Sequence, residues 1–269
     1  MDESHLSKFI KYSANTFRLV EEGIIVEKPV SLTVNGEVWL TFLCTPTDLE
    51  ALAVGFLFNE GVINSSKEIA SLRVCANREN IDVWLDISAK QPENWRRTSG
   101  CTGGFTSVRE INKIFRSVGE NIKTPSEILE MVERLLNKQN IYKKVGGVHT
   151  SFLCDQGNSF IMAEDIGRHN TLDKIAGCYL LKNCNYKNKI VITTGRISSD
   201  MLQKAARIGA SILISRTSPS SLSIELAKKW GVTLIGYARK NRFNIYTHPN
   251  RIVQISPQEA SHVPKCNQV

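Results

Sequence analysis

The sequence lacks the long apolar runs and the leader peptide that would carry a chain into or across a membrane. No window approaches the ~18 uninterrupted apolar residues that a membrane helix needs. The opening residues MDESHLSKFIKYS are acidic and then mixed, without the cationic start and apolar stretch of a signal peptide. We therefore expect a soluble protein of the cytoplasm that makes no contact with membranes.

Signatures of common metal and nucleotide enzymes are missing as well. None of the five histidines is followed by glutamate two positions on, and no C-x-x-C pair exists, so the zinc deaminase signature is absent. We therefore expect no structural or catalytic metal. The phosphate loop GxxxxGK[ST] and the dinucleotide loop GxGxxG are also absent, which argues against an ordinary nucleotide hydrolase or dehydrogenase.

What the sequence does contain is typical of a folded globular protein. Its 269 residues are 42% hydrophobic and 22% charged, close to the average for soluble domains. Seven cysteines without paired spacing fit a reducing compartment better than a disulfide framework. The formal charge of +8 favours anionic partners such as phosphates, nucleotides or nucleic acid, although a solvated cationic face would give the same total.

The N-terminal part predicts antiparallel strand pairs. Alternating apolar and polar residues indicate one hairpin in residues 29–44, around an Asn-Gly turn, and a second in residues 69–88. Between them, Thr47 and Glu50 have the spacing of a capping box ahead of a buried helix over residues 49–58.

The C-terminal part predicts an α/β domain. Residues 124–138 have a cap and an apolar stripe, which indicate a helix. From Val148 a strand pair and then alternating strands and helices predict parallel βαβ units in a sheet covered on both faces. We expect a β-rich domain over residues 1–120, which carries the Cys101 loop, and an α/β domain over residues 121–269.

Cys101 is the candidate reactive thiol. It lies in WRRTSGCTGGF, among glycines, small hydroxyls and two arginines, just ahead of a helix predicted over residues 111–118. Nearby cations and a helix N-terminus favour the thiolate, and flanking glycines leave it accessible. The other six cysteines fall in predicted strands, a helix, a polar turn and the tail. A loop cysteine without any role is the alternative.

A second candidate is the stretch AEDIGRHNTLDK. It places a carboxylate pair, a glycine, Arg168 and His169 ahead of a helix, where free backbone N–H groups and cations could bind an anion. Asn170 with Asp173 could equally be a simple helix cap, and Glu164 with Arg168 a structural ion pair. These interpretations are equally supported by the sequence.

Further candidates follow the predicted strands of the C-terminal part. His149 comes after two glycines, a weak signal because such a histidine is more often hydrogen-bonded packing. Arg196 follows the strand KIVITT directly before a helix, where open α/β sheets bind ligands, and SRTSPSS repeats this setting. Where the strand TLIGYAR runs into KNRFNIYTHPNRI, four side chains could stack on a nucleotide or bind its phosphates: Tyr237, Arg239, Lys240 and Arg242. Together these features suggest a large anionic ligand.

Five stretches in this order resemble one protein family: TSGCTGG, GGVHTS, EDIGRHNTLDK, GRISSDMLQKAA and SPSSLSIELAKKWGVTLIGYARKNRFNIYTHPNRI. From about Glu27 to Arg251 the chain resembles the formate dehydrogenase accessory sulfurtransferases of the FdhD family. Members take persulfide sulfur from a cysteine desulfurase and pass it to the molybdenum or tungsten bis(molybdopterin guanine dinucleotide) cofactor before it enters formate dehydrogenase. Their C-terminal part resembles the three-layer αβα fold of cytidine deaminases without its zinc.

The resemblance implies roles for individual residues. Cys101 aligns with the first cysteine of the family's C-x-x-C loop and would bear the persulfide. A family cofactor-binding stretch aligns with Tyr237, Ala238, Arg239, Lys240, Asn241 and Arg242. The remaining candidate cofactor contacts are His149, Arg168, His169 and Arg196. From the family we also expect a homodimer.

One departure from the family pattern concerns the relay of sulfur. Gly104 stands where many members have the second loop cysteine, so a mechanism that needs a Cys101 disulfide or a second thiol is in doubt. A single persulfide cysteine is chemically sufficient. The alternative is a non-catalytic chaperone that binds the molybdenum cofactor without moving sulfur. Nucleic-acid binding ranks third, because no recognition motif or concentrated basic run is present.

Overall fold

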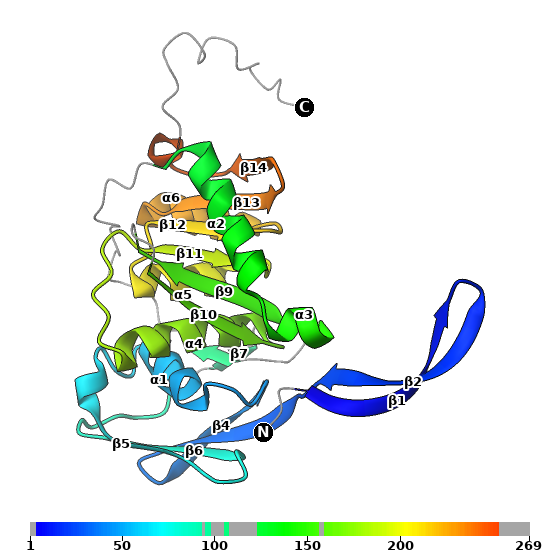
Figure 1. Ribbon diagram of the computed structural model, residues 1–269. Coiled ribbons are helices and arrows are strands. Elements are labelled where there is room, and N and C mark those ends of the chain that lie inside the picture. The colour runs from blue at the N-terminus through cyan, green and yellow to red at the C-terminus, as the bar shows by residue number, and fades with distance from the viewer. Residues whose placement is uncertain (1–3, 93–94, 98–104, 108–122, 156–158, 253–269) are drawn as a thin grey trace.

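The computed structural model describes residues 4–92, 95–97, 105–107, 123–155 and 159–252 (Figure 1). Its strands are β1 (Ser4–Ser13), β2 (Thr16–Ile25), β3 (Lys28–Val34), β4 (Glu37–Cys44), β5 (Ile69–Val74), β6 (Asn80–Leu85), β7 (Trp95–Arg97), β8 (Phe105–Ser107), β9 (His149–Cys154), β10 (Phe160–Asp165), β11 (Ile190–Thr193), β12 (Ile212–Ser215), β13 (Thr233–Arg239) and β14 (Arg242–Ile245). Its helices are α1 (Leu49–Asn59), α2 (Pro125–Lys138), α3 (Ile141–Val145), α4 (Arg168–Leu181), α5 (Ser199–Ile208) and α6 (Ser221–Trp230), with 3-10 turns at Ser66–Glu68 and Pro249–Arg251.

Three predictions fall on other parts of the chain. Cys101, the helix expected over residues 111–118 and the domain boundary expected at residue 120 lie outside the described residues. The division into two domains therefore stays a prediction. Among the described residues, no helix is long and apolar enough to cross a membrane.

A six-stranded mixed sheet forms the centre of the C-terminal part, in the order β10-β9-β11-β12-β13-β14. The strands β11, β12 and β13 are parallel and are connected through α5 and α6, as the alternation of strands and helices predicts. The outer strands are antiparallel: β9 pairs with both β10 and β11, and β14 returns along β13. The mixed α/β class is therefore confirmed.

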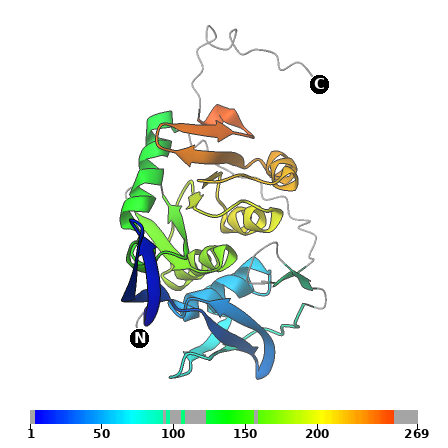
Figure 2. The same ribbon diagram turned by 90° about the vertical axis from the view of Figure 1, so that its right-hand side faces the viewer.

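Helices cover both faces of this sheet (Figures 1 and 2). Successive side chains of a strand point to opposite faces. Accordingly Phe152 packs in the core beneath α2, while its neighbour Leu153 packs in the core shared with α4, α5 and α6. All four residues of β11 and of β12 are buried, as in other parallel strands between two helical layers. The expected likeness to cytidine deaminases stays a prediction.

A second sheet, in the order β4-β3-β6-β5, packs with α1 in the N-terminal part. Both hairpins predicted from the alternation are confirmed. The turn between β3 and β4 is made by Asn35 and Gly36, whose φ angles are 49° and 83°. Two successive positive φ angles give the turn whose twist matches that of paired strands, and Asn-Gly adopts them readily.

The capping box that Thr47 was expected to begin is wrong. The N-cap of α1 is Asp48, in a left-handed conformation and without a side-chain cap, and the Thr47 hydroxyl instead accepts a hydrogen bond from Lys174 at 3.2 Å. Before α2 the same pattern does form a box: Thr124 and Glu127 each accept the other's backbone N–H. Before α1 the buried Lys174 competes for the threonine hydroxyl, whereas before α2 the hydroxyl of Thr124 caps the helix.

The helices α1 and α4 cross with their backbones in contact. A Cβ added to Gly55 of α1 would lie 1.7 Å from the carbonyl oxygen of Asp173 in α4. A Cβ added to Gly177 of α4 would lie 1.9 Å from the carbonyl oxygen of Ala51 in α1. Because each distance is far below any real contact, both positions need glycine, and this pair of glycines brings the two parts of the chain together.

One buried ion pair lies beside this crossing. Lys174 of α4 and Asp165 at the end of β10 are 2.6 Å apart and completely buried. Each also bonds Thr45 at the start of the loop before α1: the lysine donates to its carbonyl at 3.0 Å, and its amide donates to the carboxylate at 3.2 Å. Removing one partner of such a pair would leave an uncompensated buried charge.

A second buried ion pair joins α4 to α5. The carboxylate of Asp173 accepts from Lys204 at 2.6 Å and from the amide of Asn59, the last residue of α1, at 2.7 Å. Glu60 adds a second carboxylate 3.9 Å from the same lysine. These side chains account for the charged residues at the C-terminal end of AEDIGRHNTLDK, and they fix α1 against both helices.

The strands β1 and β2 form a long hairpin that the sequence analysis did not predict. Ten residue pairs are in register, and Figure 1 shows the ribbon projecting away from the body. Its base contacts the rest of the chain near α3, where Gly23 lies against Val145. Several large apolar side chains along it are exposed: Leu6, Phe9, Ile10, Tyr12, Phe17, Leu19 and Ile24.

Gly177→Ala should destabilise the fold by about 3 kcal/mol, because backbone atoms of Ala51 block the new methyl group. Urea unfolding followed by circular dichroism measures this loss. The matched control is Gly231→Ala, where nothing lies within 4 Å of the new Cβ and only a left-handed backbone adds a cost, of about 1 kcal/mol. Equal losses in the two variants would contradict the close crossing of α1 and α4.

Candidate functional site

The parallel strands β11, β12 and β13 end at one edge of the central sheet. Hydrogen bonds join the segments that leave them: the Ser215 hydroxyl donates to the Gly195 carbonyl at 2.7 Å, and the Tyr237 amide donates to the Thr217 carbonyl at 2.9 Å. Ligands of open α/β sheets bind at such ends. We call this surface the carboxyl edge; it consists of residues 194–196, 215–218 and 237–242.

Two arginines predicted as ligand contacts lie together on the α4 side of the carboxyl edge. The side chain of Arg168 passes directly over Gly195, since a Cβ there would lie 2.9 Å from the arginine Cβ. Arg196, which follows Gly195 in the chain, is exposed, and it forms no ion pair with any described residue. Both guanidinium groups act electrostatically on His149. The edge therefore has concentrated positive charge at this point.

The two predicted histidines complete this side of the site. His149 lies 3.4 Å from the Thr194 hydroxyl through Nδ1, and His169 lies 3.5 Å from the Ser198 hydroxyl through Nε2. Burial lowers the pKa of both histidines, and the charge of Arg168 lowers both further. The imidazoles are therefore neutral at pH 7, and the arginines supply the charge that would attract an anion.

The interpretation of the stretch AEDIGRHNTLDK as a simple helix cap is wrong. The N-cap of α4 is Gly167, so Asn170 lies within the first turn, and its amide donates to Asp165 at 2.9 Å. The carboxylate of Glu164 accepts the first backbone N–H groups of α3, from Asn140 and Ile141 at 2.8 Å each. Arg168 and His169 are left as the residues of this stretch that face the site.

The predicted stretch from Tyr237 to Arg242 covers the end of β13, the turn at residues 240–241 and the first residue of β14. Tyr237 and Lys240 have left-handed φ angles of 53° and 50°, and the pairing of the strands shifts register here. Tyr237 is 42% exposed, whereas Ala238 is buried beneath α2. The side chains of Arg239, Lys240, Asn241 and Arg242 are exposed. This turn therefore presents a ring and several polar groups to one side of the carboxyl edge.

A pocket of about 600 Å³ opens between this turn and α2, and we call it the α2 pocket. Two of the predicted residues, Arg239 and Lys240, line it. So does Arg216, which was not among the predicted site residues, although it lies in the stretch SRTSPSS at a strand end. The Arg239 guanidinium donates to the backbone carbonyl of Arg216 at 2.9 Å. The signal that could have found Arg216 is its position directly after β12.

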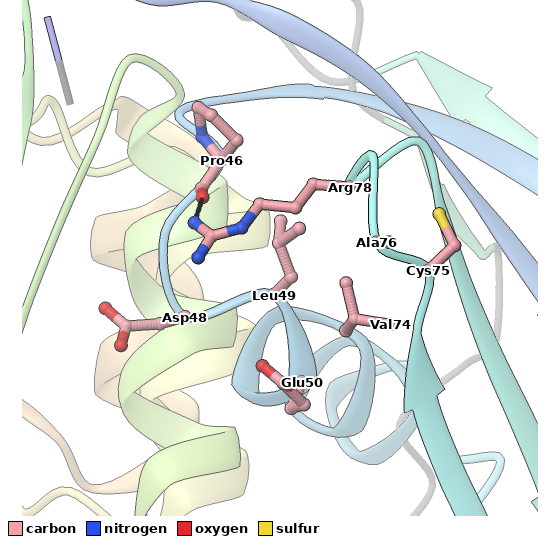
Figure 3. Close-up of a pocket in the computed structure, with 8 residues that line it drawn as sticks. All are labelled: Pro46, Asp48, Leu49, Glu50, Val74, Cys75, Ala76 and Arg78. Carbon is pink, nitrogen blue, oxygen red and sulfur yellow. Dashed lines mark hydrogen bonds between the residues drawn. The ribbon is translucent and has the colours of Figure 1, made fainter. Parts of the chain in front are cut away.

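A second pocket, of about 280 Å³, lies at the start of α1, away from the predicted site residues (Figure 3). Arg78 reaches across it and donates to the Pro46 carbonyl at 2.8 Å. Cys75 lies at the far side from Asp48, and its sulfur accepts the backbone N–H groups of the turn that follows it. These groups are satisfied within the N-terminal part, and we assign the pocket no role.

Among the described cysteines, burial makes several thiols unreactive. It raises the pKa of Cys44 to about 12 and that of Cys154 to about 11, and it also raises the pKa of Cys178. Because the thiolate is the nucleophile, these three cysteines are poor candidates for sulfur chemistry. Cys101 lies outside the described residues, so its candidacy continues to rest on the sequence of its loop.

Acidification from about pH 7.5 to about pH 5.5 should destabilise the fold. The histidine pKa values lie below the ordinary 6.5 in the folded state, so the unfolded chain binds protons first as the pH falls. His169→Gln should lose less stability over this range than the wild type. Urea unfolding at both pH values measures the difference, and an unchanged pH dependence would contradict a buried neutral imidazole at this position.

Comparisons with known proteins agree with the predicted resemblance. The sequence model of the FdhD/NarQ family matches residues 25–253. The sulfur carrier protein FdhD of Bacillus subtilis (strain 168) is 35% identical over 251 residues, which are 90% of this chain and 95% of the relative. The protein of the same name from Staphylococcus aureus (strain MRSA252) is 33% identical over 250 residues, 91% of this chain and 94% of the relative.

A solved structure shares the fold. A crystal structure from Desulfotalea psychrophila, described as a formate dehydrogenase accessory protein, matches with a TM-score of 0.79 at 32% identity. The match covers 94% of this chain and 100% of that chain. With the family match over most of its length, this chain belongs to the FdhD/NarQ family.

Proposed function

We propose that this protein is a sulfur carrier for the maturation of formate dehydrogenase. In this proposal Cys101 accepts sulfur from a cysteine desulfurase in the cytoplasm. The protein then transfers that sulfur to the bis(molybdopterin guanine dinucleotide) cofactor, which it binds as substrate. Relatives named sulfur carrier protein FdhD and a structural neighbour described as a formate dehydrogenase accessory protein support this proposal.

The sulfur step needs one accessible thiolate. The Cys101 thiolate would attack the terminal sulfur of the donor's persulfide, forming a new S–S bond while the donor's S–S bond breaks and its cysteine leaves as a thiolate. Arg96 and Arg97, in the same loop by sequence, would favour the ionised thiol. No second loop cysteine is needed for this step, which is consistent with glycine at position 104.

The observation that carries the cofactor part of the proposal is the unpaired positive charge of the carboxyl edge. Arg196, Arg216, Lys240 and Arg242 form no ion pair with any residue in the described part of the chain. Exposed cations gain little from isolated surface pairs, but several of them aimed at one edge can bind phosphates, and arginine does so bidentately. A dinucleotide cofactor carries several phosphates and aromatic bases, which suit these cations and the exposed ring of Tyr237.

We also propose that the chain acts as a homodimer. The apolar side chains exposed along the β1–β2 hairpin support contact with another protein chain, since a two-stranded hairpin standing alone is only marginally stable in water. Formate dehydrogenase and the cysteine desulfurase are the other partners in this proposal. We expect no structural metal, membrane or nucleic acid among them.

A second candidate function is a cofactor chaperone that moves no sulfur. The glycine in place of the second loop cysteine favours it, because part of the family's reactive motif is missing. The two functions differ in one measurable respect. Loss of Cys101 would abolish the work of a carrier and leave most of the work of a chaperone intact.

Incubation with a cysteine desulfurase and cysteine should add about 32 Da, one sulfur atom, to the protein. Intact-protein mass spectrometry should show this adduct in the wild type and not in Cys101→Ala. Cys75→Ala is the matched control, a half-buried thiol outside the loop, and should keep the adduct. If Cys101→Ala retains the added mass, or if the wild type never gains it, the chaperone function is favoured.

Arg196→Gln and Arg239→Gln should each weaken the binding of GDP, the nucleotide end of the proposed substrate, by about tenfold. Each change removes a charged hydrogen-bond donor from the carboxyl edge, so the salt dependence of binding should fall as well. Isothermal titration at low and high salt measures both effects. Lys229→Gln, an exposed cation near the end of α6, is the control. Wild-type affinity in both arginine variants would contradict a phosphate site here.

A further inference from the structure

The α2 pocket contains opposite charges that do not meet. Glu130 and Glu133 line it from α2, and Arg216 lines it from the end of β12. None of the three forms an ion pair or a side-chain hydrogen bond with a described residue, and the Nε of Arg216 is buried without a partner. The two carboxylates on the α2 wall of the pocket are therefore separated from the guanidinium group of Arg216 on its other wall.

The pocket also has an apolar floor, made by α2 itself. Leu129, Val132 and Leu136 line it from the same helix, and the side chain of Val132 is only 3% exposed. The spacing of the lining residues along α2 follows one helical face, so floor and carboxylates belong to a single rigid element. An apolar floor suits an aromatic ring, and the volume lies within the range of ligand pockets.

The charged walls specify which ring would fit. Carboxylates only accept hydrogen bonds, so the base must present donors to α2. Guanine carries adjacent donors at N1 and at its exocyclic N2 amino group, whereas the corresponding edges of adenine and cytosine combine a donor with an acceptor. The cations of Arg216, Arg239 and Lys240 on the opposite wall would bind the phosphates of the same nucleotide.

We propose that Glu130 and Glu133 select guanine as the base of the bound nucleotide, while Arg216 binds its phosphates. This inference rests on the proposed function, since it assigns the nucleotide end of the substrate to the α2 pocket. It adds two things: a basis for choosing one base over another, and a phosphate contact in the segment after β12. The carboxylates act on specificity, and the arginine acts on affinity alone.

The test compares GDP with inosine diphosphate and ADP by isothermal titration. Inosine diphosphate differs from GDP only in lacking the N2 amino group, so a carboxylate reader should bind it at least tenfold more weakly, the value of about one charged hydrogen bond. In Glu130→Gln and Glu133→Gln this preference for GDP should shrink, most of all in the double variant. In Arg216→Gln all three nucleotides should bind more weakly by a similar factor, with the preference for GDP retained.

The control is Glu225→Gln, an exposed glutamate of α6 on the other face of the sheet, which should match the wild type in every titration. Thermal unfolding of each variant confirms that it is folded. If the wild type binds the three nucleotides equally, or if the glutamate variants keep the full preference for GDP, the selection of guanine is wrong while nucleotide binding stands. If no nucleotide binds at all, the cofactor part of the proposed function fails too, and the mass of the Cys101 adduct still reports separately on sulfur transfer.

Discussion

The contact between the backbones of α1 and α4 is the constraint on which the rest of the arrangement depends. Glycine at positions 55 and 177 lets the helices approach until carbonyl oxygens fill the space where side chains would stand. At that distance Asp173 bonds Asn59 of α1 as well as Lys204, and Lys174 bonds the loop before α1 as well as Asp165. The crossing and the buried ion pairs thus support one another.

The same constraint positions the candidate site. Asp165 and Lys174 flank the turn that begins α4, so the pair that fixes the N-terminal part also fixes the start of this helix. Arg168 and His169 follow within that first turn and face the carboxyl edge. The charged stretch thus serves two purposes: some of its residues hold the fold, and the two between them lie beside the carboxyl edge. The sequence showed the residues without showing this division.

Much of the fold could be predicted, because its signals are local. Two strand pairs, the capped helix α2 and the parallel strands all follow from periodicity within short windows. The β1–β2 hairpin could not be predicted in this way, since its turn is made by Ala14 and Asn15 and its strands expose apolar side chains that no described residue covers. The missing cap of α1 was equally hidden, because the competing lysine is more than a hundred residues away.

The candidate site could likewise be predicted only where its signals are local in the sequence. Strand ends and a stretch of polar residues indicated most of the carboxyl edge, and the structure brings His149, Arg168, His169 and Arg196 together there. Arg216 and the carboxylates of α2 were missed, because α2 ends more than seventy residues before Arg216 in the chain. Its surface glutamates have the pattern of an ordinary solvated helix face. They line one pocket with Arg216 only in the folded chain, and a short stretch of sequence does not reveal this.

The apolar character of α1 has a consequence for how the protein is made. Nine of its eleven residues are buried, on every side of the helix, between its own sheet and the later helices. During synthesis α1 leaves the ribosome well over a hundred residues before the end of α4, and until α4 arrives the side facing Gly177 has nothing to pack against. For several seconds at ordinary translation rates, the nascent chain therefore exposes an apolar helix that molecular chaperones recognise. The close crossing that stabilises the finished molecule thus leaves one side of an apolar helix uncovered during early synthesis.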